Sequence, residues 1–264
     1  MKAPAGTPLA RLITRRPDTL GAAIWPYQCS IWDARMRLAR ILGHYEAIDK
    51  IGGPIDFDVG EQLVVLELNE IQAGLRVILD QPWHFMREGQ LTLNLVLDDV
   101  RLYSVVFSLI LEAGELVAFV GAIQGRDIDG VLASYRELTK SAHGMRPRDL
   151  IVEIFRMFCA NIGVTKIYAV SDAYRHHKHV YFKSEKPKKS SVNYDEIWSE
   201  RGGVKEDPTY FRLEVAPRER DLSTVASKKR EMYRRRYKML NDIRQQMAAS
   251  YFDLKAASPS VSLG

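Results

Sequence analysis

The chain has 264 residues and a net charge of +5, and 46% of its residues are hydrophobic. These values are ordinary for a soluble globular protein. No apolar run approaches the roughly 20 residues that a membrane-spanning helix needs, and two cysteines, Cys29 and Cys159, provide no disulfide framework. We therefore expect a cytoplasmic protein without a transmembrane segment.

Four prolines within residues 1–32 predict an irregular lead-in, because proline interrupts helices. They are Pro4, Pro8, Pro17 and Pro26. Asp33 is then suited to cap the N-terminus of a helix, and the pair Gly52 and Gly53 is suited to end it. The face of this helix that we expect to be buried consists of Met36, Ile41, Leu42, Tyr45 and Ile48.

From residue 63 the hydrophobic residues alternate with polar ones, which is typical of strands that place one face on a core. Five strands are predicted, at residues 63–68, 75–79, 91–97, 102–111 and 116–123. Short turns at residues 98–99 and 113–114 separate the last three. These strands should therefore be linked by hairpins and run antiparallel.

Residues 136–172 form the stretch around which the rest of the chain is organised. Their pattern predicts a helix, a corner at residues 144–147, a second helix and a buried strand at 167–170. Pro147 suits the first turn of the second helix, and Gly163 suits its C-cap. The apolar stripe of this second helix consists of Ile151, Ile154, Phe155, Phe158 and Ile162.

Residues 174–191 are polar and basic, and we expect them to form a long exposed loop. A short helix at 194–200 and a strand at 210–215 are predicted to follow. Ser227 can then cap a C-terminal helix. The apolar line of that helix consists of Tyr233, Tyr237, Leu240, Ile243 and Met247.

The order of these elements argues for an α+β fold with one mixed, largely antiparallel sheet flanked by helices. We predict a single domain over residues 33–252, preceded by the lead-in at 1–32. Residues 253–264 are expected to form a flexible tail. No internal repeat divides the chain.

Six segments, in order, resemble the VirK/YbjX family of bacterial proteins. They are REGQLTLNL (87–95), RLYSVVFSL (101–109), GAIQG (121–125), LTKSAHGMRPRDL (138–150), YDEIWSERGG (194–203) and SKKREMYRRRY (227–237). The similarity runs from about Arg35 to Met247, and the segment RHHKHVYFKSEKPKKSS departs from it. The resemblance implies a cytosolic protein of Gram-negative bacteria associated with virulence, envelope stress or a DNA damage response. It implies no particular biochemical activity.

The element order also resembles that of GNAT acyltransferases, in which an antiparallel meander leads to a helix whose N-terminus holds the pyrophosphate of the acyl donor. Such binding needs free backbone N–H groups at a helix start, beside a glycine turn and a basic residue. Gln124, Gly125 and Arg126 are a partial match and the candidate cofactor-binding residues, although they have fewer glycines than the GNAT pattern. If the resemblance holds, the cofactor is a coenzyme A thioester. The alternative is a strand end and a tight turn without a ligand.

Three side chains are candidates for acid–base catalysis. Glu88 precedes the long meander and can act as a general base if it is desolvated. His143 lies at the corner between the two helices, where it can act in catalysis or bind an anion. Tyr194 can donate a proton in the comparison with GNAT enzymes. The plainer alternatives are a solvated strand end for Glu88 and a capping or packing role for His143.

Three histidines close together, His176, His177 and His179, raise the question of a zinc site, since imidazole is a common zinc ligand. Their neighbours Arg175 and Lys178 repel a cation, and no cysteine lies nearby. We therefore expect no metal site.

The C-terminal helix is basic on its outer faces. Its candidate anion-binding residues are Lys228, Lys229, Arg234, Arg235 and Arg236. Clustered cations can neutralise the phosphates of nucleic acid or of acidic lipids; the plainer alternative is a docked helix with a charged, solvated outer face. Two classes of function stay open: a GNAT-like acyltransferase with an unknown acceptor, and a non-enzymatic binding or adaptor protein that contacts nucleic acid or another anionic partner.

Overall fold

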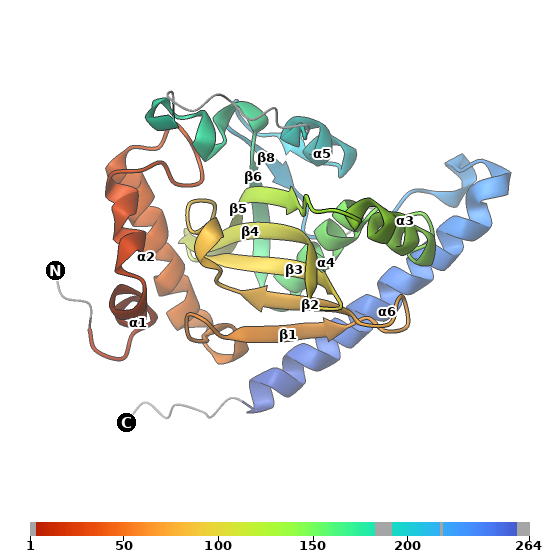
Figure 1. Ribbon diagram of the computed structural model, residues 1–264, viewed down its shortest axis with the longest axis horizontal. Helices are drawn as coiled ribbons and strands as arrows, with labels where there is room; N and C mark the ends of the chain where they lie inside the picture. The colour runs from red at the N-terminus through yellow and green to blue at the C-terminus, as the bar shows by residue number, and fades with distance from the viewer. Residues whose placement is uncertain (1–3, 183–191, 217–218, 258–264) are drawn as a thin grey trace.

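In the computed structural model, residues 4–182, 192–216 and 219–257 are described, with side chains up to residue 250. They form one unit built on an eight-stranded mixed sheet with helices packed around it (Figure 1). The predicted α+β class is therefore confirmed. None of the helices in this part of the chain combines the length and the apolar character needed to cross a bilayer.

The N-terminal segment is more regular than its prolines suggested. Helix α1 (Pro8–Arg15) has Pro8 in its first turn, and Pro17 starts the 3-10 helix Pro17–Ala23. Proline is tolerated at the first helical position because its missing N–H would have no partner there. The expectation of an irregular chain was therefore wrong for residues 8–23.

Helix α2 (Ala34–Ile51) begins and ends where the sequence predicts. The Asp33 carboxylate accepts a hydrogen bond from the Met36 N–H at 2.8 Å, which satisfies one donor of the first turn. Gly52 ends the helix with a φ of +60°, a conformation that glycine adopts without strain.

The buried face of α2 differs from the predicted one. Three of the five predicted residues are buried: Ile41, Tyr45 and Ile48. Met36 and Leu42 are exposed, while His44 is buried and its Nδ1 accepts a hydrogen bond from the Leu109 N–H at 3.0 Å. The helix is thus turned so that a polar side chain can pair with a strand, which hydrophobic spacing alone does not predict.

The strands lie in the order β1-β2-β3-β4-β5-β6-β8-β7, and all neighbours are antiparallel except β5 and β6. The five predicted strands of the meander are present, and the last three are linked by tight hairpins as expected. Their bounds are β1 (Gln62–Glu67), β2 (Leu75–Asp80), β3 (Leu91–Leu97), β4 (Val100–Glu112) and β5 (Glu115–Gly125).

The pairing of the parallel strands β5 and β6 ends before β5 does, because β6 is the shorter strand. Strand β6 (Val164–Val170) pairs with β5 only as far as Val120, which lies opposite Ala169. Beyond that point β5 continues to Gly125 and stays paired with β4 on its other side. The residues of β5 after Val120 therefore have no strand partner on the side of β6, and we call this unpaired edge of β5 the opening between β5 and β6.

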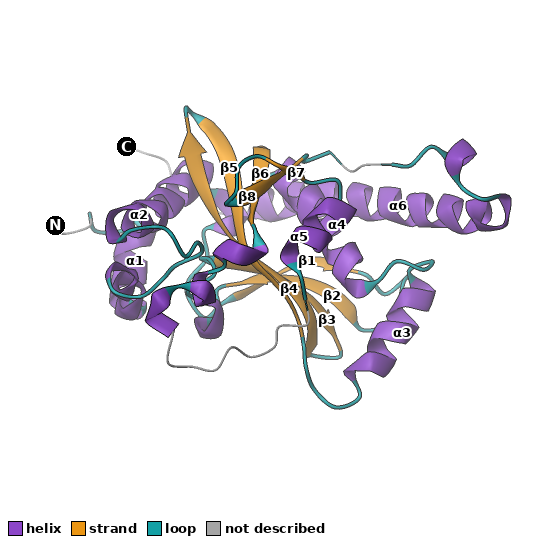
Figure 2. Cartoon of the chain, turned by 90° about the horizontal axis from the view of Figure 1, so that it is seen from above, coloured by secondary structure: helices purple, strands orange, loops and turns teal. Residues whose placement is uncertain are grey.

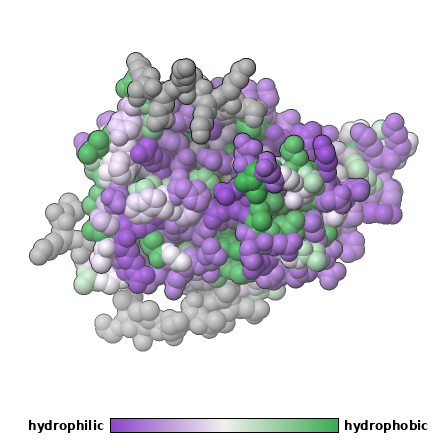
Figure 3. All heavy atoms as spheres, viewed as in Figure 1, coloured by the Kyte–Doolittle hydropathy of each residue, from purple (hydrophilic) through white to green (hydrophobic). Residues whose placement is uncertain are grey.

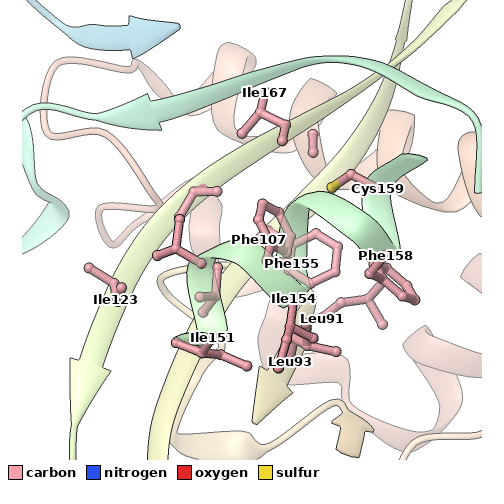
Figure 4. Packing of buried hydrophobic residues seen from close by; sticks show 14 of the residues in the cluster. Leu91, Leu93, Phe107, Ile123, Ile151, Ile154, Phe155, Phe158, Cys159 and Ile167 are labelled. Carbon is pink, nitrogen blue, oxygen red and sulfur yellow. The ribbon is translucent and has the colours of Figure 1, made fainter. Parts of the chain in front are cut away.

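Two helices connect β5 to β6, as predicted: α3 (Val131–Ser141) and α4 (Pro147–Asn161). The whole predicted stripe of α4 is buried against the sheet. At its centre the ring of Phe155 lies 4.8 Å from that of Phe107 on β4 (Figure 4). Helix α4 contacts β3, β4 and β6, so it covers the middle of the sheet.

The C-terminal part supplies α5 (Tyr194–Glu200), β7 (Val204–Lys205), β8 (Tyr210–Leu213) and the long helix α6 (Ser227–Ala257). The short strand β7 was not predicted. Helix α6 contacts α4 and β1 and crosses behind the sheet (Figures 1 and 2). It continues past residue 253, where a tail was expected, and residues 258–264 lie outside the described part.

Candidate functional site

Neighbouring residues of β4 meet different layers, because side chains alternate between the faces of a sheet. Phe107 packs on α4, whereas the Ser108 hydroxyl lies 2.7 Å from the Tyr27 hydroxyl in the N-terminal segment. The candidate site spans both faces beside the opening between β5 and β6. One part is a closed polar cluster on the side of the N-terminal segment, and the other is an open pocket on the side of α4.

The closed cluster consists of Glu88, Arg175, His176 and Tyr194, and we call it the Glu88 centre. Glu88 Oε1 lies 3.6 Å from His176 Nε2, and their side chains are 10% and 12% exposed. The guanidinium of Arg175 lies 3.8 Å from the centre of the Tyr194 ring. A turn before β3, the segment after β6 and helix α5 thus bring four residues together that are far apart in the sequence.

Burial dominates the electrostatics of the Glu88 centre. It raises the pKa of Glu88 from 4.5 to about 7, although backbone N–H groups, Arg87 and Arg175 oppose the rise. Burial also lowers the pKa of His176 to about 3, with contributions from His177 and Arg175. Between these values both partners are neutral, so their contact there is not an ion pair. A carboxyl group that titrates near neutral pH is well suited to accept a proton.

The Tyr194 hydroxyl closes the free edge of β5. It donates a hydrogen bond to the Ile123 carbonyl at 2.9 Å and accepts one from the Ile123 N–H at 3.0 Å. Tyr194 is fully buried, and burial raises its pKa to about 12. A molecule that hydrogen-bonds to this edge of β5 therefore has to displace the Tyr194 hydroxyl.

The open part is a pocket of about 910 Å³ between α3, the start of α4 and α6, which we call the α3–α4 pocket. Tyr103 and Tyr135 form an aromatic wall, with ring centres 5.6 Å apart. Leu132, 64% exposed, adds apolar surface. Figure 3 shows hydrophobic atoms gathered near α3 on a mostly hydrophilic face. The pocket therefore combines apolar walls with the charges described next.

Five cationic side chains line the α3–α4 pocket: Arg136, Lys140, Arg146, Arg148 and Arg235. Three of them have acidic partners, since Arg148 pairs with Asp149, Lys140 with Glu137 and Arg235 with Glu231. Within the described residues, Arg136 and Arg146 have none. They lie beside the N-terminus of α4, where the helix dipole also favours an anion.

The three residues proposed to bind a cofactor lie at the end of β5. The Arg126 N–H donates to the Leu102 carbonyl at 2.8 Å. The ring of Tyr103 approaches Gly125 so closely that a Cβ there would lie 2.8 Å from it. Tyr103 lines the α3–α4 pocket, and Gln124, Gly125 and Arg126 are not part of that lining as described. They border the opening between β5 and β6 and stay a prediction.

His143 and Glu88, both proposed as catalytic, lie in different parts of the site. His143 lines the α3–α4 pocket and has a φ of +50° at the corner between α3 and α4. Its carbonyl accepts hydrogen bonds from Arg236 Nη2 and Nε, at 2.9 and 3.2 Å. The fold brings Tyr194, the third candidate, to Glu88.

The proposed anion-binding residues of α6 have unequal surroundings. Arg234 and Arg235 both pair with Glu231, at 3.5 and 3.1 Å. Arg236 is held against the corner between α3 and α4, as described above. Lys228 and Lys229 are exposed, and no acidic partner lies near them in the described chain. Their positive charges are thus the least compensated of the group.

Sequence reasoning considered His176 only as a zinc ligand and missed its contact with Glu88, and it did not propose the cations Arg136 and Arg146 as site residues. Nothing local predicts the contact of His176, because its partner Glu88 comes from a distant turn. The corner HGMRPRD did hold a usable signal, since it places a glycine and arginines at a helix start. No three His, Cys, Asp or Glu side chains in residues 4–182, 192–216 and 219–250 are arranged to hold a metal ion.

These features define a class of α+β protein with an antiparallel meander, one parallel strand pair and a helix-start pocket. A family model described as "Protein of unknown function (DUF535)" matches residues 3–249, so the chain belongs to that family. It is similar to the protein YbjX of Escherichia coli K12, with 26% identity over 251 residues, 91% of this chain and 74% of that protein. The resemblance to the VirK/YbjX family is thereby confirmed.

Two proteins of Haemophilus influenzae are also similar. They are 35% identical over 124 residues and 31% identical over 129 residues. Each match covers 47% of this chain and 40% of the relative.

Proposed function

We propose that this protein is a GNAT-like acyltransferase that uses a coenzyme A thioester as acyl donor. The observation that carries the proposal is the opening between the parallel strands β5 and β6 after Val120. A free strand edge can bind an extended arm that carries amide groups, in the manner of β-augmentation. The pantetheine arm of coenzyme A is such an arm, and the Tyr194 hydroxyl now holds the place it would take.

The α3–α4 pocket suits the phosphorylated end of this donor. Its volume of about 910 Å³ lies within the range of cofactor sites. Arg136 and Arg146 have charges free for phosphates, and the first turn of α4 adds backbone donors. The aromatic pair Tyr103 and Tyr135 offers a surface for a base to stack on. Phosphates held there would leave the arm to run along β5 towards the Glu88 centre.

The Glu88 centre supplies the groups that acyl transfer needs. An acceptor nucleophile, an amine in GNAT-type chemistry, attacks the thioester carbonyl while the Glu88 carboxylate takes a proton from it. The new bond to the carbonyl carbon forms as the carbon–sulfur bond breaks, and the leaving thiolate takes a proton. Tyr194 is the candidate for that proton, because its hydroxyl lies on the β5 edge at Ile123. Arg175, over its ring, favours the phenolate that results.

Binding of coenzyme A and acetyl coenzyme A, measured by calorimetry, tests the donor site. Arg146→Gln should weaken binding about tenfold or more, since a charge-assisted hydrogen bond contributes about 1.5–3 kcal/mol. The matched control is Arg35→Gln, which removes an exposed arginine from α2 and should leave binding unchanged. No binding of either compound, or equal losses in both variants, would contradict the proposal.

Catalysis is tested by following thiol release from acetyl coenzyme A in the presence of a panel of amines. Glu88→Gln should lose activity while it still binds the donor, because only the proton acceptor is removed. Tyr194→Phe should lower the rate and alter donor affinity, because the phenyl ring no longer hydrogen-bonds to Ile123. Unchanged rates in Glu88→Gln would assign the chemistry to another residue.

A second candidate function is a binding or adaptor protein that contacts nucleic acid or another anionic partner. The exposed and uncompensated charges of Lys228 and Lys229 at the start of α6 favour it. Either function would fit a role in virulence, envelope stress or a damage response, which the family resemblance implies. Salt-dependent binding to nucleic acid or anionic vesicles, weakened by Lys228→Gln, tests this alternative.

A further inference from the structure

A second cavity, of about 530 Å³, lies between α4, α5 and α6. Its buried wall carries charged side chains on an otherwise apolar helix: Glu153 and Arg156 of α4 are 7% and 2% exposed. Arg201, which follows α5, lines the same cavity and is partly buried. Charges this deeply buried are costly unless they have partners, so their contacts are informative.

The three side chains pair with one another only in part. Glu153 Oε1 lies 3.4 Å from Arg156 Nη1 and 4.0 Å from Arg201 Nη1. Arg156 Nη2 donates to the Arg201 carbonyl at 2.6 Å, and Arg201 Nη2 lies 3.7 Å from Asp149 Oδ2. These contacts hold the carboxylate and the two guanidinium groups in fixed positions around one end of the cavity.

Three buried atoms of this cluster have no partner among the described residues: Nε of Arg156, Nε of Arg201 and Oε2 of Glu153. Two are donors on cations and one is an acceptor on an anion. Leaving a buried charged group unsatisfied costs more than an ordinary hydrogen bond contributes. Among the described residues, the two arginine donors thus have no acceptor and the glutamate oxygen has no donor.

The rest of the cavity indicates what kind of molecule fits. Tyr233, Tyr237 and Leu240 of α6 give it an amphipathic wall. Its lining has five arginines (Arg156, Arg201, Arg220, Arg236 and Arg244) and four acids (Glu153, Glu200, Glu219 and Asp221), a difference of +1. Such a near balance favours a ligand that carries both signs of charge over a simple anion.

We propose that this cavity binds a small zwitterion of the α-amino acid type. Its carboxylate accepts hydrogen bonds from the side chains of Arg156 and Arg201, and its ammonium group donates to Glu153. Its side chain lies against the tyrosines of α6. This inference does not depend on the acyltransferase function, since the residues of the cavity are separate from the Glu88 centre and from the cations assigned to the donor.

The test is a thermal-shift and calorimetric screen of the full chain with each of the twenty proteinogenic L-amino acids. Every amino acid that binds is then compared with its two truncated analogues, the carboxylic acid without the amino group and the amine without the carboxylate. We expect both analogues to bind about tenfold or more weakly, because each lacks one set of charge-assisted hydrogen bonds. A carboxylic acid that binds as tightly as its amino acid would overturn the proposal, and so would the absence of binding by all twenty.

Variants locate the site. Glu153→Gln should abolish the preference for the amino acid over its carboxylic acid analogue, while Arg156→Lys should weaken the binding of both. Glu46→Gln, at an exposed glutamate of α2, is the matched control and should keep the parent's preference. If Glu153→Gln does not fold, Tyr237→Ala at the cavity wall is used instead, and it should also weaken the binding of the amino acid. If an amino acid binds to Glu153→Gln and to Tyr237→Ala as tightly as it binds to the parent protein, its binding site lies elsewhere. That result would also contradict the proposal.

Discussion

The two parts of the candidate site lie on opposite faces of β5 and differ in their access to water. At Gly121, β5 touches the carbonyl of Glu88, so the Glu88 centre is packed against the strand without space for a side chain. At Gly125, the same strand touches only the end of the Tyr103 ring, a side chain that lines the open α3–α4 pocket. Strand β5 thus contacts the buried Glu88 centre on one face and borders the solvent-exposed α3–α4 pocket on the other.

Because of this difference in access to water, charges have different effects in the two parts of the site. In the buried centre, burial outweighs the opposing effects of backbone N–H groups, Arg87 and Arg175 and raises the pKa of Glu88 to about 7, into the range where a carboxyl group can exchange protons at neutral pH. In the open pocket, Arg136 and Arg146 are exposed to solvent, so their charges can attract an anion from solution. Salt should weaken binding at the pocket and have little effect inside the centre.

The largest effect on the free energy of unfolding is expected in the core between α4 and the sheet. Phe155 is 3% exposed and packs on Phe107 of β4, in the core between the sheet and α4. Phe155→Ala should cost about 3–5 kcal/mol of the free energy of unfolding, because it leaves a cavity in the core. Urea unfolding measures this cost. A loss below about 0.5 kcal/mol, the scale of surface substitutions, would contradict the packing of α4 on the sheet.

The second prediction uses the opposite pKa shifts of Glu88 and His176. The folded state raises the pKa of Glu88 from 4.5 to about 7, so it binds more protons than the unfolded state in that range. The contribution of Glu88 to stability is therefore present below pH 4.5 and falls by about 3 kcal/mol as the pH rises to 7. The pKa of His176 falls from 6.5 to about 3, so its contribution is present above pH 6.5 and is lost as the pH falls.

The two contributions oppose each other between about pH 4.5 and 6.5, and substitutions separate them. The stability of the parent minus that of Glu88→Gln should decrease as the pH rises from 4.5 to 7. The stability of the parent minus that of His176→Gln should increase as the pH rises from 3 to 6.5. Urea unfolding at several pH values gives both curves. Flat curves, or curves with the same sign, would show that the centre is open to water.

The third prediction compares the two glycines of β5 directly. A Cβ at Gly121 would overlap the Glu88 carbonyl oxygen, a backbone atom that cannot move without its chain. Gly121→Ala should therefore cost about 1–3 kcal/mol, as overpacking does. Gly125→Ala meets only the tip of the Tyr103 ring and should cost less than about 1 kcal/mol. Equal costs would mean that the two faces do not differ in packing.

Where local chemistry decides the structure, the sequence predicts it well. Asp33 caps α2 because its carboxylate lies three residues from the N–H that it binds, and the strands of the meander follow from their alternation. Helix α4 follows from its apolar period. Each of these signals is contained within a few residues, so no knowledge of the tertiary fold is needed.

Contacts between residues that are far apart in the chain are poorly predicted from the sequence. Glu88 was a candidate from its place before a strand, but its raised pKa depends on burial by segments far along the chain. His176 was placed in an exposed loop because its neighbours are polar, and its contact with Glu88 appears only in the folded chain. Met36 was expected inside for its position on a helical face, whereas the pairing of His44 with β4 turns that face outwards. These outcomes follow from packing, which composition and period do not record.

The smallest effect on stability is expected in the first turns of α6, where Lys228 and Arg235 are exposed. Lys228→Gln and Arg235→Gln should each change the free energy of unfolding by less than about 0.5 kcal/mol, since exposed charges contribute little. Binding to single-stranded nucleic acid, duplex nucleic acid and anionic vesicles is then titrated at two salt concentrations. If α6 binds phosphates, a lost contact should lower affinity and reduce the salt slope by about one unit.

The structure predicts which of the two substitutions weakens phosphate binding more. Arg235 already pairs with Glu231 at 3.1 Å, whereas Lys228 has no acidic partner in the described residues. Removing Lys228 should therefore weaken phosphate binding more than removing Arg235, and Lys50→Gln on α2 should change nothing. Should the unmodified protein show no salt-dependent binding to any of these partners, α6 is a docked helix with a solvated face.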